Sequence, residues 1–307
     1  MPKSSIAAVI VTHNPQVDVL SYNISKVISQ VDSVIVIDNA STNQDVLHNL
    51  FVHKVVSFIA NEMNLGIAAA FNKGANFAKS KGLSYILLLD QDSTTSLNMI
   101  SRLWDAHNSI RSRGILISAV GPTYKDPVTE NTAYFIQASQ QQAKKQSVVT
   151  DKDDYVSADY LISSGSFISV EAFEEIGPFD ESLFIDRVDT EWFFRARSLG
   201  FQAFGVPDAG MHHTLGEKTR KVWFGRWRHV PQHKPFRQYY MYRNSILLYK
   251  RDYIPLLWKI NDLIKLVYLF AFSMFCMPEK VKRLSMITSG IFDGLRGKSG
   301  KLEYTLE

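Results

Sequence analysis

Five consecutive apolar residues, from Tyr85 to Leu89, end abruptly at two carboxylates, Asp90 and Asp92. An apolar run of this length is typical of a strand that is buried on both faces, as in a parallel sheet. Parallel sheets place their ligand sites at the carboxyl ends of the strands. Two acids at such an end could hold a hard divalent cation, which usually brings a phosphate-bearing substrate. The same acids could instead cap the helix expected near residues 97–102.

Alternation of strand and helix runs through the first half of the chain. Apolar runs predict strands at 6–11, 34–37 and 55–59, before the run at 85–89. Helical spacing follows the first run, and a second helix is expected to open at Gly66. Strands that alternate with helices form right-handed crossovers and a sheet covered on both faces. The sequence therefore predicts an α/β fold, with a mostly parallel central sheet flanked by helices.

The pattern of the second half is looser. Residues 140–154 are rich in Gln, Lys and Asp, which predicts an exposed loop. Helices are expected at 171–176 and at 190–199, where Gly200 ends the second one, and a strand is expected at 201–206. At 307 residues the chain is long enough for one large α/β domain with a C-terminal extension.

Charge divides the chain into an acidic body and a basic tail. Residues 1–215 hold 16 basic and 23 acidic residues, whereas residues 216–307 hold 18 and 7, a net charge of +11. Such a tail attracts nucleic acid or an anionic membrane surface, the latter by about 1 kcal/mol per basic residue. Aromatic and aliphatic residues interleave with its charges, which favours the membrane. The single cysteine, Cys276, excludes an internal disulfide and fits a reducing compartment.

An uncharged stretch of 13 residues lies within the tail, at 266–278. A helix that spans a bilayer needs about 20 apolar residues, so this stretch is too short to cross a membrane. It contains four aromatic residues and has basic residues on both sides, which predicts a helix lying in the membrane interface. A buried core helix or a dimer-forming helix would show the same composition.

Polar side chains follow the predicted strands at the points where they end. Thr12 and Asn14 follow the first strand, and Asp38 follows the second. Each could be a loop cap, but parallel strands bring these ends to one crevice, which predicts a nucleotide site. Small residues after Gly66 would allow a ligand close to the backbone. The chain has neither a G-x-x-x-x-G-K-S/T loop nor a G-x-G-x-x-G fingerprint, which argues against a P-loop kinase and a conventional dehydrogenase.

Taken in order along the chain, these motifs resemble the inverting glycosyltransferases of family 2, which have the GT-A fold. The resemblance covers about the first 245 residues, and it rests on 9–14, 37–41, 64–74, 90–92, Gly165, 184–192 and 213–216. In detail the chain looks most like bacterial rhamnosyltransferases of surface-polysaccharide (O-antigen) assembly. The features that carry this likeness are 38–41, 90–92, 189–192 and 239–244.

The resemblance implies a role for each matching residue. The residues that would contact the donor nucleotide-sugar are Thr12, Asn14, Asp38, Asn64, Gly66, Asn72, Asp90 and Gln91. Asp92 and His213 would bind a metal ion, Mg²⁺ or Mn²⁺. Asp189 would be the catalytic base. The residues that would contact the acceptor are Glu191, Trp192, Gly165 and Arg243.

Elementary chemistry supports a base at Asp189. Inverting transfer requires one base to take the proton of the acceptor hydroxyl, and a positive centre beside the departing diphosphate. A carboxylate suffices because the proton moves late, and burial can raise its pKa toward the working pH. Asp189 opens a predicted helix, where it could also be a plain N-cap. The family's Glu-Asp pair is Val188-Asp189 here, and Asp186 could supply the missing acid.

Other assigned side chains also have ordinary structural alternatives. Trp192 is expected to pack in the core, although it could also line a sugar site. Arg243 could hold a diphosphate-linked acceptor through two hydrogen bonds, or it could form a surface salt bridge. His212 is adjacent to His213, points a different way and is expected to be structural.

The organisation implied for the chain is a GT-A catalytic domain at 1–215 and a basic, amphipathic helical region at 216–307 that associates with membranes. The catalytic domain would have a donor half at about 1–120 and an acceptor half at about 121–215.

The implied activity is metal-dependent transfer of a sugar, foremost L-rhamnose from dTDP-L-rhamnose, onto a lipid-diphosphate-linked glycan. The enzyme would sit peripherally on the cytoplasmic face of the bacterial inner membrane, with no nucleic acid as partner, and a homodimer through the tail stays open. Two alternatives are a non-catalytic membrane scaffold that binds a sugar nucleotide and a sugar-1-phosphate nucleotidyltransferase. The second needs a glycine-rich, basic loop after the first strand, where this chain has Thr-His-Asn-Pro at 12–15.

Overall fold

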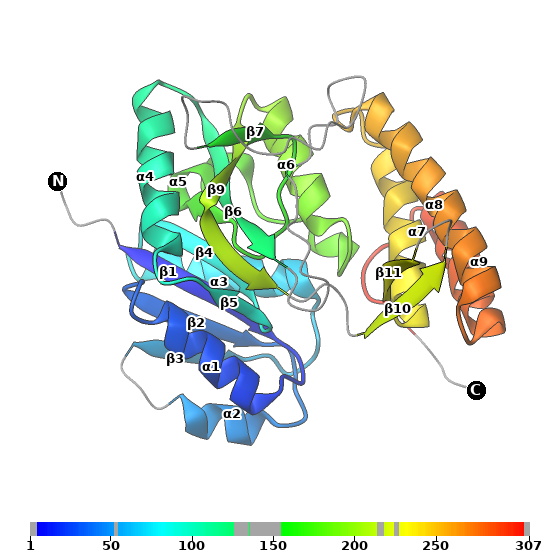
Figure 1. Ribbon diagram of the computed structural model, residues 1–307, viewed down its shortest axis with the longest axis horizontal. Helices are drawn as coiled ribbons and strands as arrows, with labels where there is room; N and C mark the ends of the chain where they lie inside the picture. The colour runs from blue at the N-terminus through cyan, green and yellow to red at the C-terminus, as the bar shows by residue number, and fades with distance from the viewer. Residues whose placement is uncertain are drawn as a thin grey trace.

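A central sheet with helices on both faces forms the body of the molecule, and three long helices stand to one side of it (Figure 1). The computed structural model describes residues 5–51, 55–125, 135, 155–213, 218–223 and 227–303. In this part of the chain nine strands form the sheet, in the order β3-β2-β1-β4-β8-β6-β9-β5, with β7 paired to β9. The predicted α/β class with C-terminal helices is confirmed.

The first half of the sheet is parallel, as the alternation predicted. Its strands are β1 (Ile6–Thr12), β2 (Ser33–Asp38), β3 (Val56–Ala60) and β4 (Tyr85–Asp90). Its helices are α1 (Val17–Val27), α2 (Gln44–Leu50), α3 (Ile67–Ser80) and α4 (Met99–Ser112). The strand β1 lies between β2 and β4, and its residues are buried along its whole length. Burial on both faces is the reason that these strands are continuous apolar runs in the sequence.

The second half makes the sheet mixed. The strands β6 (Ile117–Lys125) and β9 (Gln202–His213) are parallel to each other, whereas β5 (Ser93–Thr95), β7 (Val156–Ala158) and β8 (Phe167–Ser169) are antiparallel to their neighbours. The other elements here are α5 (Val170–Ile176), the short 3-10 helix η1 (Glu181–Leu183) and α6 (Val188–Ser198). Each antiparallel strand has three residues, too few to produce a recognisable alternation, and the sequence did not predict them. The loop predicted at 140–154 lies outside the described residues.

Two apolar layers hold the sheet and its helices together. One layer contains Ala7 and Val9 of β1 with residues of α3, α5 and α6. The other layer contains Ala8 and Ile10 with residues of α1 and α4. Successive side chains of a strand point to opposite faces, so one strand serves both layers. Because both faces are covered, the carboxyl ends of the strands are the natural place for a ligand.

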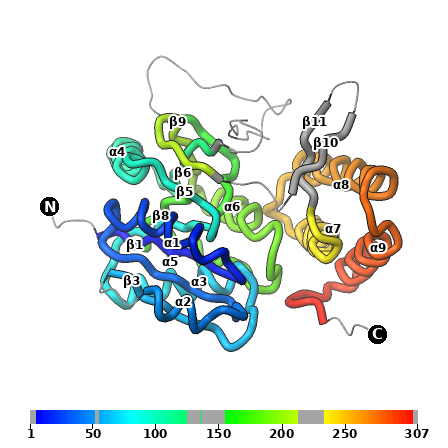
Figure 2. Tube along the Cα trace, turned by 60° about the horizontal axis from the view of Figure 1, so that its bottom comes forward, coloured from blue at the N-terminus to red at the C-terminus, as the bar shows by residue number. Residues whose placement is uncertain are grey.

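The C-terminal helices form a group beside the sheet (Figures 1 and 2). They are α7 (Pro235–Tyr249), α8 (Leu256–Cys276) and α9 (Lys280–Arg296), and they follow a hairpin of β10 (Lys218–Trp223) and β11 (Trp227–Gln232). A Cβ atom at Gly290 of α9 would come within 2.5 Å of the Tyr239 carbonyl oxygen of α7, so glycine lets these two helices touch backbone to backbone. Leu248, Ile254 and Trp258 belong to the same apolar cluster as α3 and α6. The helices therefore share the core of the sheet domain.

The uncharged stretch at 266–278 covers the second half of α8, which runs from Leu256 to Cys276. Among the helices of the described residues, none combines the length and the apolar character that crossing a membrane requires.

Candidate active site

Three predicted site residues meet at one edge of the sheet. The register of β1 and β2 pairs Thr12 with Asp38, and the register of β1 and β4 pairs Val11 with Asp90. The carboxyl ends of three neighbouring parallel strands therefore lie at the same level. This is the arrangement that open α/β sheets use to bind ligands.

The Asp38 carboxylate organises the loop after β2. It is fully buried and accepts hydrogen bonds from Thr12 Oγ1 (2.7 Å), Ser41 N (2.9 Å), Ser41 Oγ (2.5 Å) and Gln44 Nε2 (2.8 Å). A buried carboxylate needs such partners, because an unpaired one would lose its hydration without compensation. In this arrangement Thr12 and Asp38 fix the shape of the site, and their polar atoms are committed to the loop.

The exposed rim of the site is formed by the loop after β1. Asn14 is exposed, and its Oδ1 accepts hydrogen bonds from Thr42 N (2.8 Å) and Thr42 Oγ1 (3.0 Å). The neighbouring His13 N–H donates to Gln91 Oε1 (2.8 Å). These contacts tie the loops after β1, β2 and β4 together. Asn14 and Gln91 remain predicted contacts of a donor nucleotide.

Asp90 and Asp92 lie at the turn from β4 into β5, with partly buried side chains. The strand β5 pairs Ser93 with His213, the last residue of β9. The fold thus brings the backbone of His213 next to the residue that follows Asp92, although the two are far apart in the sequence. The side chain of His213 and residues 214–216 lie outside the described part of the chain.

The donor set at this turn fits a cation that is shared with a substrate. Within the described residues no three His, Cys, Asp or Glu side chains come close enough to form a protein-only metal site. Mg²⁺ and similar ions are commonly held by one or two carboxylates, with substrate phosphates and water completing the coordination. Asp90 and Asp92 provide two carboxylates at the edge where open α/β sheets bind ligands, which meets that requirement.

The loop that carries Gly165 is anchored to the same turn. Asp90 N–H donates to Ser164 Oγ (3.1 Å), and the hydroxyl groups of Ser93 and Ser164 lie 2.6 Å apart. Gly165 is buried, with φ +88°, and its N–H donates to the Leu88 carbonyl (2.7 Å). Gly165 therefore lies beside the carboxylates, and its contact with an acceptor remains a prediction. Ser164 is a site neighbour that the sequence did not single out.

Asp189 has the environment of a base. It is the second residue of α6, whose N-cap is Arg187, so it is not the N-cap that the sequence left open. Its Oδ1 accepts a hydrogen bond from Thr190 N (2.7 Å). Burial raises the pKa of the Asp189 carboxyl, Asp186 adds to this effect, and the Thr190 N–H and the Arg187 charge oppose it. A raised pKa suits a base that must accept a proton near neutral pH.

The loop that leads to Asp189, residues 183–187, has a strained backbone. Phe184, Asp186 and Arg187 all have left-handed φ values, between 63° and 66°. Phe184 is the centre of a tight γ-turn, closed by Ile185 N–H donating to the Leu183 carbonyl (2.8 Å). Side chains other than glycine adopt such values only where their surroundings impose them, and they gather at functional sites. We call residues 183–187 the base loop.

Helix α7 imposes this conformation from one side. Asn244 Nδ2 donates to the carbonyls of Leu183 (2.9 Å), Ile185 (2.8 Å) and Asp186 (2.8 Å). Arg237 holds the Asp186 carboxylate through two hydrogen bonds, of 2.5 and 3.2 Å. The segment 239–244, which helped to carry the family resemblance, thus contributes to holding the base loop. Asn244 and Arg237 have no local signal for this role, because it depends on a contact between distant segments.

Arg243 is not available to an acceptor, which corrects its assignment. The side chain is fully buried, and its guanidinium donates to the carbonyls of Gly300 (2.5 Å) and Leu183 (3.0 Å) and to Asn244 Oδ1 (2.9 Å). It also lies over the rings of Tyr239 and Tyr240. The guanidinium N–H groups that could bind a diphosphate therefore form hydrogen bonds inside the protein instead.

Helix α3 supports the base loop and the segment before it. Ile67 N–H donates to the Phe184 carbonyl (2.8 Å), and a Cβ atom at Gly66 would lie 2.5 Å from that oxygen. Asn72 is buried and exchanges two hydrogen bonds with the Phe179 backbone, of 2.8 and 2.9 Å. The small and amide residues that suggested a nucleotide pocket are thus explained by close packing of this segment. The contact of Gly66 and Asn72 with a donor remains a prediction beside this packing role, and Asn64 accepts a local hydrogen bond from Gly66 N–H (2.9 Å).

Glu191 and Trp192 are interior residues, which corrects their assignment to the acceptor. Glu191 is 1% exposed and pairs with Arg195 (2.9 Å) and Arg251 (3.0 Å), while Tyr253 Oη donates to it (2.6 Å). Trp192 is fully buried, and its Nε1–H donates to the Gly177 carbonyl (2.8 Å). The core-packing alternative for Trp192 is therefore the correct one.

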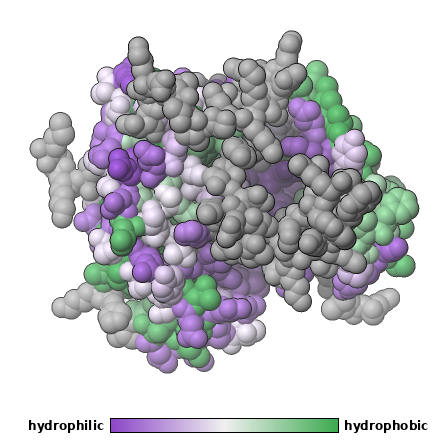
Figure 3. Space-filling view, viewed as in Figure 1, coloured by the Kyte–Doolittle hydropathy of each residue, from purple (hydrophilic) through white to green (hydrophobic). Residues whose placement is uncertain are grey.

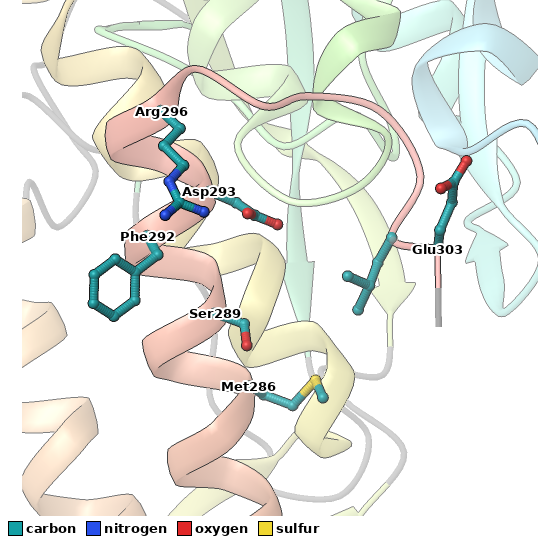
Figure 4. A pocket seen from close by; sticks show the side chains of 7 residues that line it. Met286, Ser289, Phe292, Asp293, Arg296 and Glu303 are labelled. Atoms are coloured by element: carbon teal, nitrogen blue, oxygen red, sulfur yellow. The ribbon is translucent and has the colours of Figure 1, made fainter. Parts of the chain in front are cut away.

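A cavity of about 500 Å³ lies on α9 and the segment that follows it (Figure 4). Its lining residues are Met286, Ser289, Phe292, Asp293, Arg296, Leu302 and Glu303. None of them is a predicted site residue, but Met286 and Leu302 pack in the same apolar cluster as Phe184 and Ile185 of the base loop.

Comparison with known proteins gives a family match and a full-length relative. Residues 7–177 match the model of glycosyl transferase family 2. Over 304 residues the chain is 31% identical to a dTDP-rhamnosyl transferase, RfbF, of Shigella flexneri, with 98% of this chain and 99% of that protein covered.

Solved structures show the same fold at low sequence identity. The first 349 residues of S. aureus TarS in complex with UDP-GlcNAc superpose with a TM-score of 0.57 at 14% identity, over 96% of this chain and 81% of that chain. GalNAc-T7 with UDP, GalNAc and Mn²⁺ gives a TM-score of 0.55 at 17% identity, over 90% of this chain. The chain spans only 57% of the length of GalNAc-T7. At these identities the likeness concerns the fold alone.

Proposed function

The chain belongs to glycosyl transferase family 2, and on that premise we propose that it is a metal-dependent, inverting rhamnosyltransferase. The donor would be dTDP-L-rhamnose, and the acceptor a glycan linked to a lipid diphosphate, in the assembly of a bacterial surface polysaccharide. The observation that carries the proposed chemistry is the partly buried Asp189, which follows a strained loop and has a raised pKa. The choice of donor is supported by the full-length relative, whose name gives dTDP-rhamnose chemistry.

In the proposed reaction Asp189 takes the proton of the acceptor hydroxyl while that oxygen forms a bond to the anomeric carbon. The bond between this carbon and the diphosphate oxygen breaks, and its electron pair leaves with the diphosphate, so that the configuration inverts. Asp92, with Asp90 and His213 beside it, would hold a divalent cation that supplies positive charge to the departing diphosphate. His13 and Asn14 lie at the rim, where the nucleotide would enter.

Donor binding can be tested by thermal shift with a panel of sugar nucleotides. We expect dTDP-L-rhamnose with Mn²⁺ to raise the melting temperature more than UDP-GlcNAc does. At a free donor concentration of about 100 times Kd, binding stabilises the folded state by about 2.7 kcal/mol. Asp92→Ala should lose the part of the shift, measured against its own free protein, and the part of the turnover that depend on Mn²⁺.

The matched control is Asp105→Ala, which removes an exposed acid on α4 and should behave like the wild type. Equal responses of the Asp92 and Asp105 variants to Mn²⁺ would exclude Asp92 from the metal site. Donor binding without any sugar transfer or donor hydrolysis would favour the alternative of a non-catalytic scaffold.

We also propose that α8 lies on the cytoplasmic face of the bacterial inner membrane. One face of this helix packs inward through Trp258, Asp262, Leu266 and Ser273. The other face exposes a row of apolar residues, namely Leu256, Ile260, Leu263, Ile264, Val267, Tyr268 and Phe275. In Figure 3, hydrophobic residues gather along the edge where Figure 1 has α8 and α9. Exposed basic residues such as Lys265, Lys280 and Lys282 border this face, as in helices that lie in an anionic interface.

A vesicle assay tests the membrane proposal. We expect the protein to sediment with vesicles that contain anionic phospholipid, and to bind them more weakly in high salt. The double substitution Val267→Asp and Phe275→Asp should weaken this binding by about tenfold or more, because each change removes an apolar side chain from the interface. Leu116→Asp, at an exposed apolar position outside α8, is the control. Unchanged vesicle binding of the double variant, together with loss of a dimer in sedimentation equilibrium, would instead assign the face to a second copy of the chain.

A further inference from the structure

We propose that Arg187, held by Asp262 of α8, is a positioning residue for the catalytic base Asp189. This inference rests on the proposed function, because it assigns a role within the reaction that Asp189 would perform. It adds a residue of the C-terminal helices to the machinery of the sheet domain.

The contacts of Arg187 reach two helices beyond its own. Its Nη2 donates to Asp262 Oδ1 (2.6 Å), and its Nε donates to Ser245 Oγ of α7 (3.1 Å). Its guanidinium lies over the ring of Trp258, 5.6 Å from the ring centre. A planar group with several fixed donors can make all of these contacts at once, whereas an ammonium group cannot.

Asp262 is itself fixed in place. It is 2% exposed, and Tyr249 Oη donates to its second carboxylate oxygen (2.9 Å). A carboxylate on a helix that faces inward, with both oxygens bonded, is a rigid anchor for Arg187. Position 262 lies beside the exposed Leu263 in the sequence, but the turn of the helix directs Asp262 inward. The helix α8 thus has an outer apolar face and an inner face that binds the base loop through the contact between Asp262 and Arg187.

The contact between Arg187 and Asp262 affects Asp189 because of where Arg187 lies in the chain. Arg187 is the N-cap of α6, in a left-handed conformation, and Asp189 follows two residues later. Movement of Arg187 would shift the first turn of α6 and, with it, the carboxylate of Asp189. A displacement of about 1 Å at a reacting group can cost about a hundredfold in rate.

The ion pair of Arg187 and Asp262 is also linked to Asp189 through charge, because it affects the pKa of the Asp189 carboxyl. The charged and titratable groups that act on Asp189 or lie around it are Asp186, Arg187, Tyr160 and Asp262, and Arg237 of α7 binds Asp186. Arg187 lowers the pKa of Asp189, and Asp262 compensates the Arg187 charge. The pKa of Tyr160 is raised to about 12 by burial and then by Asp189, so this phenol stays protonated and neutral beside the base.

The test measures the pH dependence of kcat/KM for three variants. The activity of a carboxylate base falls as the pH drops through its pKa, which produces an acidic limb. Asp262→Asn leaves the Arg187 charge uncompensated and should move this limb to lower pH. Arg187→Gln removes the cation and should move the limb to higher pH. Both variants should lose about tenfold to a hundredfold in kcat, while KM for the donor changes little.

A third variant separates position from charge. Arg187→Lys keeps the charge but cannot bridge Ser245 and Asp262, so kcat should fall while the limb stays near its wild-type pH. This variant also keeps the test decisive if Asp262→Asn does not fold. The control is Asp159→Asn, which breaks the ion pair with Arg197 (2.5 Å) at the other end of α6 and should leave kcat and the limb unchanged.

The inference would be overturned if folded Arg187→Gln and Asp262→Asn had a wild-type kcat and an acidic limb of kcat/KM at the wild-type pH. That result would leave the proposed function intact. The proposed function itself fails in a different way, namely if the wild type transfers no sugar from dTDP-L-rhamnose or if Asp189→Asn keeps full activity. The two failures are therefore distinguished within one set of assays.

Discussion

Replacement of Asp189 by asparagine will lower the rate of sugar transfer by about two to four orders of magnitude, the usual contribution of a general base. Asparagine has nearly the same shape and keeps an oxygen to accept the hydrogen bond from Thr190 N. It cannot take a proton from the acceptor hydroxyl. The loss should therefore lie in kcat at saturating donor, while the Kd of the donor, measured by calorimetry, stays within about twofold.

Asp186→Asn is the control for this prediction. Asp186 lies three residues before Asp189 and could supply the acid that is missing from the family's pair, but its carboxylate is bound by Arg237. We expect a smaller loss of kcat for Asp186→Asn than for Asp189→Asn. The reverse order of the two losses would assign the base to Asp186. For the wild type, burial raises the pKa of Asp189, so the acidic limb should lie above the pH range of an ordinary aspartate.

Replacement of Glu191 by alanine will lower the free energy of unfolding by about 3–5 kcal/mol, as the removal of one partner from a buried ion pair does. Arg195 and Arg251 both pair with the Glu191 carboxylate, and Tyr253 Oη donates to it. Alanine would leave two arginines and a phenol without this partner in the interior. The loss can be measured by urea denaturation, followed by both fluorescence and circular dichroism.

Glu171→Ala is the matched control, because Glu171 pairs with Arg111 on the surface, where both side chains are more than half exposed. Removal of such a pair changes stability by about 1 kcal/mol or less. The family resemblance instead implies that Glu191 contacts the acceptor. The variant Glu191→Gln can test this competing prediction. A folded Glu191→Gln variant with wild-type stability and a raised acceptor KM would restore Glu191 as an acceptor contact.

The parallel half of the sheet could be predicted because its signal is local. Strands buried on both faces must be apolar throughout, so β1, β2 and β4 are recognisable from their own residues. The polar residues at their ends, such as Asp38 and Asp90, could then be placed at one edge by topology alone. The short strands β5, β7 and β8 carry no such signal, since their pairing is decided by partners elsewhere in the chain.

Roles were harder to predict than positions. A glutamate, an arginine and an asparagine in family motifs suggest ligand contacts, because exposed polar groups are free to bind. Glu191, Arg243 and Asn72 are instead buried, and each is bonded to other parts of the protein. Whether a polar side chain faces a ligand or the interior depends on what packs over it, and that is a property of the tertiary structure.

The sequence by itself determined the α/β class, the edge of the sheet where the parallel strands end, and the choice of Asp189 as the candidate base. Those features follow from apolar periodicity, from topology rules and from motifs that lie within short segments. Only the tertiary structure decided how that base is held. The base loop lies between α3 and α7, and Arg187 reaches Asp262 on α8, through contacts between residues far apart in the chain. Such contacts leave no local pattern, because any residue of suitable shape and charge can make them once the fold has brought the segments together.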